Sequence, residues 1–192
     1  MVGGRDGAGA FSATTTKIPL NIAADASQTV GTIAAGSSLG TARWVLGVDT
    51  ANATTAPLVG TSQYVYAFGG ATAAGATSAA QAALVGVNGD LGVWTNVQNM
   101  TPARSSFGST ILNNYLFGFG GLVNASIIPD NGGVSGQVSS APPALVNWQN
   151  TTGTLTAKRE LPGSTLLGSF FYVLGGRTDL LPATRTTDQI VW

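Results

Sequence analysis

The most constraining feature of this sequence is a tryptophan followed, at a nearly constant distance, by a Gly-Gly pair. Trp44 precedes the first pair by 25 residues, Trp94 precedes the second by 26, and Trp148 precedes the third by 27. The pairs are Gly69-Gly70, Gly120-Gly121 and Gly175-Gly176, and Trp192 is the fourth tryptophan of the series. A period of about fifty residues is typical of an array of similar units, such as a β-propeller, rather than of an ordinary single-core domain.

Each unit is predicted to contain four short strands. An aromatic segment precedes every Gly-Gly pair, at residues 64–68, 115–119 and 170–174. Residues 106–112 lead into the second of these segments through Asn113-Asn114, a two-residue turn that favours positive φ and predicts a β-hairpin. A second hairpin is predicted at residues 84–94. The chain is therefore expected to be all-β, a single array over 1–192 with units at about 1–44, 45–94, 95–148 and 149–192.

Two arginines also follow the repeat. Arg104 and Arg159 each precede the first glycine of a pair by 16 residues. The same distance before Gly69 leads to Ala53, so the first unit is expected to lack the arginine. An anion-binding role is one possibility for these arginines, but their repetition favours a structural role in holding backbone carbonyls or a carboxylate.

The combined pattern resembles kelch repeats, in particular the divergent kelch repeats of bacterial surface proteins. The clearest copy runs from Gly89-Asp90-Leu91-Gly92-Val93-Trp94 through Thr101-Pro102-Ala103-Arg104 to Gly120-Gly121. The resemblance covers nearly the whole chain and implies a kelch-like β-propeller or partial propeller. Proteins of this family serve as protein-binding platforms, adhesion modules and, in one branch, copper oxidases, so the resemblance alone does not assign an activity.

The chain departs from the kelch pattern at its ends. Kelch propellers generally have six or seven blades, whereas four units are found here, and Val2-Gly3-Gly4-Arg5 matches the middle of a blade. The strand before Gly3 is expected to be supplied by another part of the chain or by a neighbouring molecule, and we favour the neighbour. Head-to-tail repetition of such a contact builds a filament or a sheet.

Composition excludes several classes of function. Eight basic residues balance eight acidic ones, so the chain lacks the positive charge expected of a protein that binds nucleic acid or anionic lipid. Cysteine and histidine are absent, which removes disulfides, the commonest metal ligands and the copper site of the oxidase branch. No cofactor is expected. No apolar run approaches the roughly 20 residues that span a bilayer.

The candidate site residues are interpreted as structural. One tryptophan per unit is expected to pack between units, with sugar stacking as the alternative, and the Gly-Gly pairs are expected to permit unusual backbone shapes. Aspartates near turns are expected to cap those turns, with calcium binding or acid–base chemistry as alternatives. These are Asp6, Asp90, Asp130, Asp179 and Asp188. Glu160 is the only glutamate, which disfavours a glycosidase.

The sequence therefore favours a non-enzymatic structural subunit of an extracellular or cell-surface structure, active in self-assembly as a homo-oligomer or polymer. Its low charge, 8% of residues, offers little resistance to association. The alternative is a carbohydrate- or protein-binding propeller module of a larger adhesin.

Overall fold

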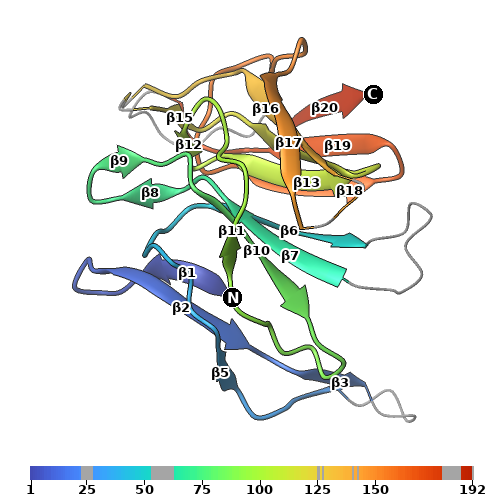
Figure 1. Cartoon of the computed structure of the whole chain (residues 1–192). Helices are drawn as coiled ribbons and strands as arrows, with labels where there is room; N and C mark the ends of the chain where they lie inside the picture. The colour runs from blue at the N-terminus through green and yellow to red at the C-terminus, as the bar shows by residue number, and fades with distance from the viewer. Residues whose placement is uncertain are drawn as a thin grey trace.

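The computed structural model describes residues 1–22, 28–52, 63–124, 126, 128–139, 141, 143–178 and 187–191. Regular structure in these residues consists of short antiparallel strands, so the predicted all-β class is confirmed. Figure 1 shows the principal sheets following one another along the molecule, from the blue N-terminal strands to the red strand β20. Among the described residues, no helix of the length and hydropathy needed to cross a bilayer is found.

Four principal sheets follow one another along the chain, and we number them in that order. The first sheet contains β1 (Val2–Arg5), β2 (Phe11–Lys17) and β5 (Ala34–Gly36). The second contains β6 (Gly47–Asn52), β7 (Gln63–Phe68), β10 (Ala80–Val85) and β11 (Thr95–Asn96). The third contains β13 (Gly108–Leu112), β14 (Tyr115–Phe119), β16 (Gly133–Val138) and β17 (Leu145–Asn150). The fourth contains β18 (Gly163–Leu167), β19 (Phe170–Leu174) and β20 (Thr187–Val191).

The described residues also form three two-stranded ribbons. They are β3 (Leu20–Ile22) with β4 (Gln28–Val30), β8 (Ala71–Thr72) with β9 (Gly75–Ala76), and β12 (Arg104–Ser105) with β15 (Leu122–Val123).

The second and third sheets are antiparallel meanders in which four strands pair in chain order. The predicted Asn113-Asn114 turn joins β13 to β14, and both asparagines have positive φ, 48° and 65°. Such turns match the twist of the strands that they connect. By the position of the Gly-Gly pair, β1, β2 and β5 correspond to the second, third and fourth strands of a full meander. On the same basis β18, β19 and β20 correspond to its first three strands.

The core consists of seams between successive sheets rather than of one central cluster. Between the first and second sheets the buried residues include Leu39, Val65 and Trp94. The seam between the second and third sheets is the largest and includes Tyr66, Phe68 and Leu116. The third and fourth sheets meet at Phe119, Phe171 and Val173. The first strands β6, β13 and β18 lie side by side along this stack.

The Gly-Gly pairs end the second strands with positive φ angles, as at Gly120 (72°) and Gly121 (82°). A β-carbon on Gly121 would overlap the backbone oxygen of Ser105, which cannot move aside as a flexible side chain could. Both the backbone conformation and the close approach of the next segment therefore require glycine here.

We predict that Gly121→Ala lowers the free energy of unfolding by about 3–5 kcal/mol, because it combines positive φ with a backbone clash. The matched control is Gly168→Ala, where φ is also positive (60°) but a β-carbon would meet open space. That control should cost only about 1–2 kcal/mol, the penalty for a left-handed conformation. Urea unfolding measures both, and equal losses in the two variants would contradict the proposed clash.

Candidate functional site

A backbone hydrogen bond links the Gly3-Gly4, Gly69-Gly70 and Gly120-Gly121 pairs each to an arginine that precedes the following sheet. The carbonyl of Arg43 accepts from the Gly4 amide at 2.9 Å, that of Arg104 from Gly70 at 2.9 Å, and that of Arg159 from Gly121 at 2.7 Å. We call this repeated contact the glycine–arginine seam. Because it joins two main-chain groups, it fixes the spacing of successive sheets independently of side-chain packing.

The guanidinium groups of the same arginines are buried and turn toward the second strand of their own sheet. Arg43 donates to the carbonyls of Ala67 and Ala79 at 3.1 and 2.7 Å. Arg104 donates to the carbonyl of Gly120 and forms an ion pair with Asp130 at 3.0 Å, whereas Arg159 donates to the carbonyl of Gly175 at 2.8 Å. Burial lowers the pKa of Arg43 to about 10 and also lowers that of Arg104. These contacts hold backbone carbonyls and a carboxylate.

Arg43 corrects the expectation that the first unit lacks an arginine. Each of the three arginines stands four residues before the first strand of its sheet, at Gly47, Gly108 and Gly163. In the second sheet, residues 53–62 separate β6 from β7, in place of the two-residue turns of the later sheets. This longer connection moves Arg43 to 26 residues before Gly69 instead of 16. Ala53, the position expected from the count, lies outside the described residues.

Trp94 and Trp148 occupy equivalent positions in the second and third sheets. Trp94 lies next to the fourth strand of the second sheet, and Trp148 lies in that of the third. Their indole N–H groups donate to carbonyls that follow the preceding sheet, at Ser37 (3.1 Å) and Gln98 (2.9 Å). Both side chains therefore pack between sheets and satisfy their polar atom there.

Trp44 departs from the repeat. Trp44 follows Arg43 directly and forms a β-bridge with Ala71. Ser105 and Glu160 take the place of Trp44 in the later units, where they pair with Leu122 and Arg177. In the later units, several residues separate the tryptophan from the arginine that follows it. The long β6–β7 connection makes up for these residues, so the distance from Trp44 to Gly69 resembles the later tryptophan-to-glycine distances. Trp192 directly follows β20, a third strand, and itself lies outside the described residues.

The carboxylates near turns have partners in most described cases. Asp6 Oδ1 accepts from the amides of Ala8 and Ala10 at 3.0 and 2.8 Å, and Asp90 pairs with Lys17 at 2.5 Å. Asp130 accepts from the Gly132 amide at 3.1 Å in addition to its contact with Arg104. Glu160, which sequence reasoning left unpaired, is buried and bound by Arg177.

The remaining two aspartates are not described at the side-chain level. Asp179 lies outside the described residues, and of Asp188 only the backbone position in β20 is described. In the part of the chain that the structure describes, no group of three acidic side chains is placed to hold a metal ion.

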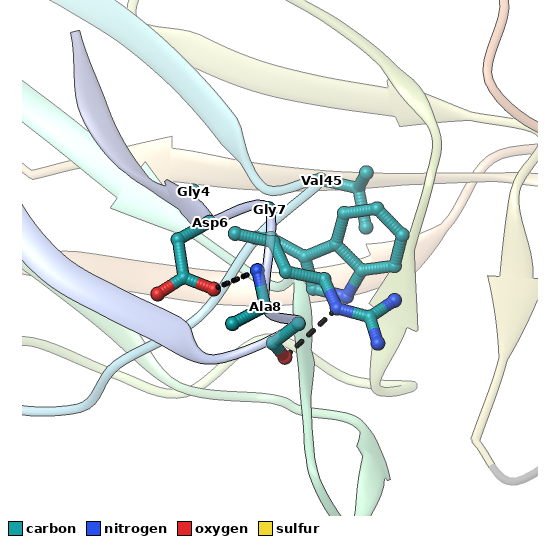
Figure 2. Close-up of a pocket in the computed structure, with 8 residues that line it drawn as sticks. Gly4, Asp6, Gly7, Ala8 and Val45 are labelled. Atoms are coloured by element: carbon teal, nitrogen blue, oxygen red, sulfur yellow. Dashed lines mark hydrogen bonds between the residues drawn. The ribbon is translucent and has the colours of Figure 1, made fainter.

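An open hollow of about 610 Å³ lies at the β1–β2 turn, and Figure 2 shows Gly4, Asp6, Gly7, Ala8 and Val45 around it. The Arg5 guanidinium stands 5.2 Å from the Trp44 ring centre and 5.7 Å from that of Phe11. Its Nε also donates to the Gly9 carbonyl at 2.9 Å. The turn is thus held by its own Arg5 and Asp6, whose polar atoms bind local backbone.

A second hollow, of about 410 Å³, lies on the outer half of the third sheet, on the side that faces the fourth sheet. Its floor contains the half-buried rings of Tyr115 and Phe117, whose centres are 6.2 Å apart. Polar groups rim it. We call it the third-sheet hollow, lined by Tyr115, Phe117, Ser135, Gln149, Asn150, Thr151 and Thr152.

The fourth sheet exposes apolar side chains on the face that points away from the third sheet. Along β19, Phe171 and Val173 point inward, whereas Phe170 and Leu174 are 37% and 41% exposed. Leu167 of β18 pairs with Phe170 of β19 and is 67% exposed. We call the surface formed by Leu167, Phe170, Tyr172 and Leu174 the fourth-sheet outer face.

No protein-family model matches the chain, and no curated protein matches it.

Asp49 is a half-buried aspartate with a buried Oδ2 atom, which sequence reasoning missed. It lies on β6 opposite Tyr66, and its Oδ2 atom and the Tyr66 hydroxyl have no hydrogen-bond partner among the described residues. Burial raises the pKa of Asp49 to about 6, an effect that a hydrogen bond with the Ser109 side chain partly offsets. Folding therefore favours the protonated acid more than the unfolded chain does.

We predict that Asp49→Asn stabilises the protein at pH 8 and has little effect at pH 4. A pKa raised from 3.8 to about 6 leaves stability intact below pH 4 and reduces it as the pH rises through 6. Removing that penalty should gain about 2–3 kcal/mol at pH 8. Urea midpoints at the two pH values test this, with Thr50→Asn on the same strand as a control that introduces no such pH dependence. A gain that is equal at both pH values would contradict the assignment.

Proposed function

We propose that this chain is a non-enzymatic structural subunit that assembles with copies of itself, and that its sheets are blade units of a kelch-like partial propeller. The support for the kelch-like architecture is the recurrence of one meander with one glycine–arginine seam and one inter-sheet tryptophan position. The charge-poor composition, with equal numbers of acidic and basic residues, is compatible with an extracellular or cell-surface setting in which subunits pack closely.

The observation that carries the assembly proposal is the fourth-sheet outer face. By distance from the Gly-Gly pair, Leu174 corresponds to Phe68 in the second sheet and to Phe119 in the third. Both phenylalanines are fully buried because the following sheet covers them, whereas Leu174 is 41% exposed. A face that is a seam in two sheets thus remains uncovered on the fourth, and uncovered apolar faces of this kind favour association.

The opposite end of the stack supplies a surface for the contact. Ala13 and Thr15 of β2 face the second sheet, so the alternating residues Ser12, Thr14 and Thr16 point the other way. A second copy that places this Ser/Thr surface on the fourth-sheet outer face continues the order of the sheets. Such a contact joins different surfaces of the two copies, and repetition builds an open filament or sheet.

The non-enzymatic assignment is supported by the chemistry of the side chains present. Without histidine or cysteine the chain cannot form the usual nucleophile–base pairs. Its sole glutamate is bound by Arg177, and Asp130 is bound by Arg104.

We predict that Leu174→Lys abolishes concentration-dependent association, because it places a charge where an apolar contact forms. Light scattering across a dilution series measures this for the whole chain. The matched control is Val87→Lys, a fully exposed site in a turn away from the face, which should assemble like the unaltered chain. Thr14→Lys should also block association, because Thr14 lies on the opposite surface of the proposed contact. A dimer formed by the fourth-sheet outer faces of two copies would not use Thr14 and would tolerate this change. A chain that is monomeric at every concentration would refute the proposal.

A further inference from the structure

We infer that the hollow at the β1–β2 turn binds a neutral sugar ring. In this site the Trp44 indole provides an aromatic surface, the Arg5 guanidinium donates hydrogen bonds to sugar hydroxyl groups, and Asp6 accepts one. The inference does not depend on self-assembly, because none of these three residues belongs to either surface of the proposed contact between copies.

The hollow lies beside the first glycine–arginine seam and has the size of a ligand site. Its lining consists of residues 4–9 together with Trp44 and Val45, all of which belong to the described part of the chain. Its volume of about 610 Å³ falls within the range of roughly 300–1,000 Å³ that is typical of small-molecule sites. We call it the β1–β2 hollow.

The repeat does not require an aromatic side chain at position 44. Ser105 and Glu160 take the place of Trp44 in the two later seams, and each of the three pairs with the residue that follows the Gly-Gly pair of its own sheet. This pairing uses the backbone, which a serine provides as well as a tryptophan. The Trp44 side chain is half-buried and borders the β1–β2 hollow, so its exposed part can contact a ligand.

Arg5 likewise differs from its counterparts, because Ala71 and Leu122 follow the Gly-Gly pairs of the two later seams. Its guanidinium is held 5.2 Å from the Trp44 ring centre, and its Nε donates to the Gly9 carbonyl. These contacts leave the two terminal nitrogens of Arg5 without a hydrogen-bond partner in the described part of the chain. Two such nitrogens form a planar fork that suits two neighbouring oxygen atoms.

Asp6 adds an acceptor beside this donor. Its Oδ1 atom accepts from the amides of Ala8, a bond drawn in Figure 2, and Ala10. Its Oδ2 atom has no partner among the described residues. Because one carboxylate and one guanidinium are the charged groups of this lining, their charges cancel, and the β1–β2 hollow does not attract an anion as a whole.

A neutral pyranose matches this set of groups. Each hydroxyl group of a sugar both donates and accepts, so neighbouring hydroxyls can satisfy the Arg5 nitrogens and the Asp6 oxygen together. The C–H groups on one face of the ring bury apolar area against the indole of Trp44. Because local contacts already order Arg5 and Asp6, binding does not incur the full entropic cost of fixing these side chains.

The probes are four neutral oligosaccharides, namely maltohexaose, cellohexaose, mannohexaose and chitohexaose, with trigalacturonate as the anionic comparison. We expect saturation-transfer NMR to detect binding of at least one neutral probe to the full chain. In a titration of the ¹⁵N-labelled chain, the indole N–H resonance of Trp44, assigned by its absence from Trp44→Ser, should shift saturably. A neutral ligand should bind equally well when the salt concentration is raised about tenfold.

The variants Trp44→Ser and Arg5→Ala test the site without departing from the repeat, because they introduce the residues found at these places in the next seam, Ser105 and Ala71. Each should weaken binding at least tenfold, with circular dichroism confirming the fold. Arg5→Lys should not restore binding, because it keeps the charge but loses the fork. Tyr115→Ala, in the third-sheet hollow, is the aromatic control that leaves binding unchanged.

Three results would overturn the inference. The first is the absence of binding by every neutral probe. The second is binding that persists in Trp44→Ser, including binding that is lost in Tyr115→Ala instead. The third is binding of trigalacturonate alone with loss at high salt, which would make Arg5 an anion site rather than part of a site for neutral sugars.

Discussion

The structure depends on one repeated main-chain hydrogen bond. Its donor is the amide of the second glycine of a pair, and its acceptor is the carbonyl of the arginine that precedes the next sheet. It occurs at Gly4, Gly70 and Gly121 with donor–acceptor distances of 2.7–2.9 Å. All three glycines have positive φ, and the first glycine of each pair leaves room for the carbonyl, because a β-carbon on Gly3, Gly69 or Gly120 would overlap the same arginine oxygen. The buried guanidinium of the same arginine then holds carbonyls of its own sheet, so one residue joins two sheets.

This linkage explains why the core is divided into seams. Each sheet is held at a fixed spacing from its neighbour, and the second and third sheets each bury one face against the sheet before and one against the sheet after. Repeat architectures of this kind derive their stability from the contacts between adjacent units. A face without a neighbour keeps the apolar character that its position in the repeat dictates. The fourth-sheet outer face is a consequence of that rule.

Local features of the fold could be predicted from the sequence. The aromatic second strands, the turn at Asn113-Asn114 and the Gly-Gly conformations depend on short segments whose preferences are strong. Spacing arguments were less reliable where a connection changed length. The long β6–β7 connection hid Arg43 and gave Trp44 an apparent equivalence with Trp94 that their contacts do not share. The burial of the Asp49 Oδ2 atom and the exposure of Leu174 depend on how distant segments pack, so no local pattern indicates them.

Amide hydrogen exchange at Gly70 and Gly121 tests the central claim most directly. Their amides end strands and face turns, where rapid exchange would ordinarily be expected. If the glycine–arginine seam holds the sheets together, these two amides exchange only through opening of the whole seam and match the protection of the buried strands β7 and β14. Exchange at the rate of an unstructured glycine, while β7 and β14 remain protected, would contradict the account.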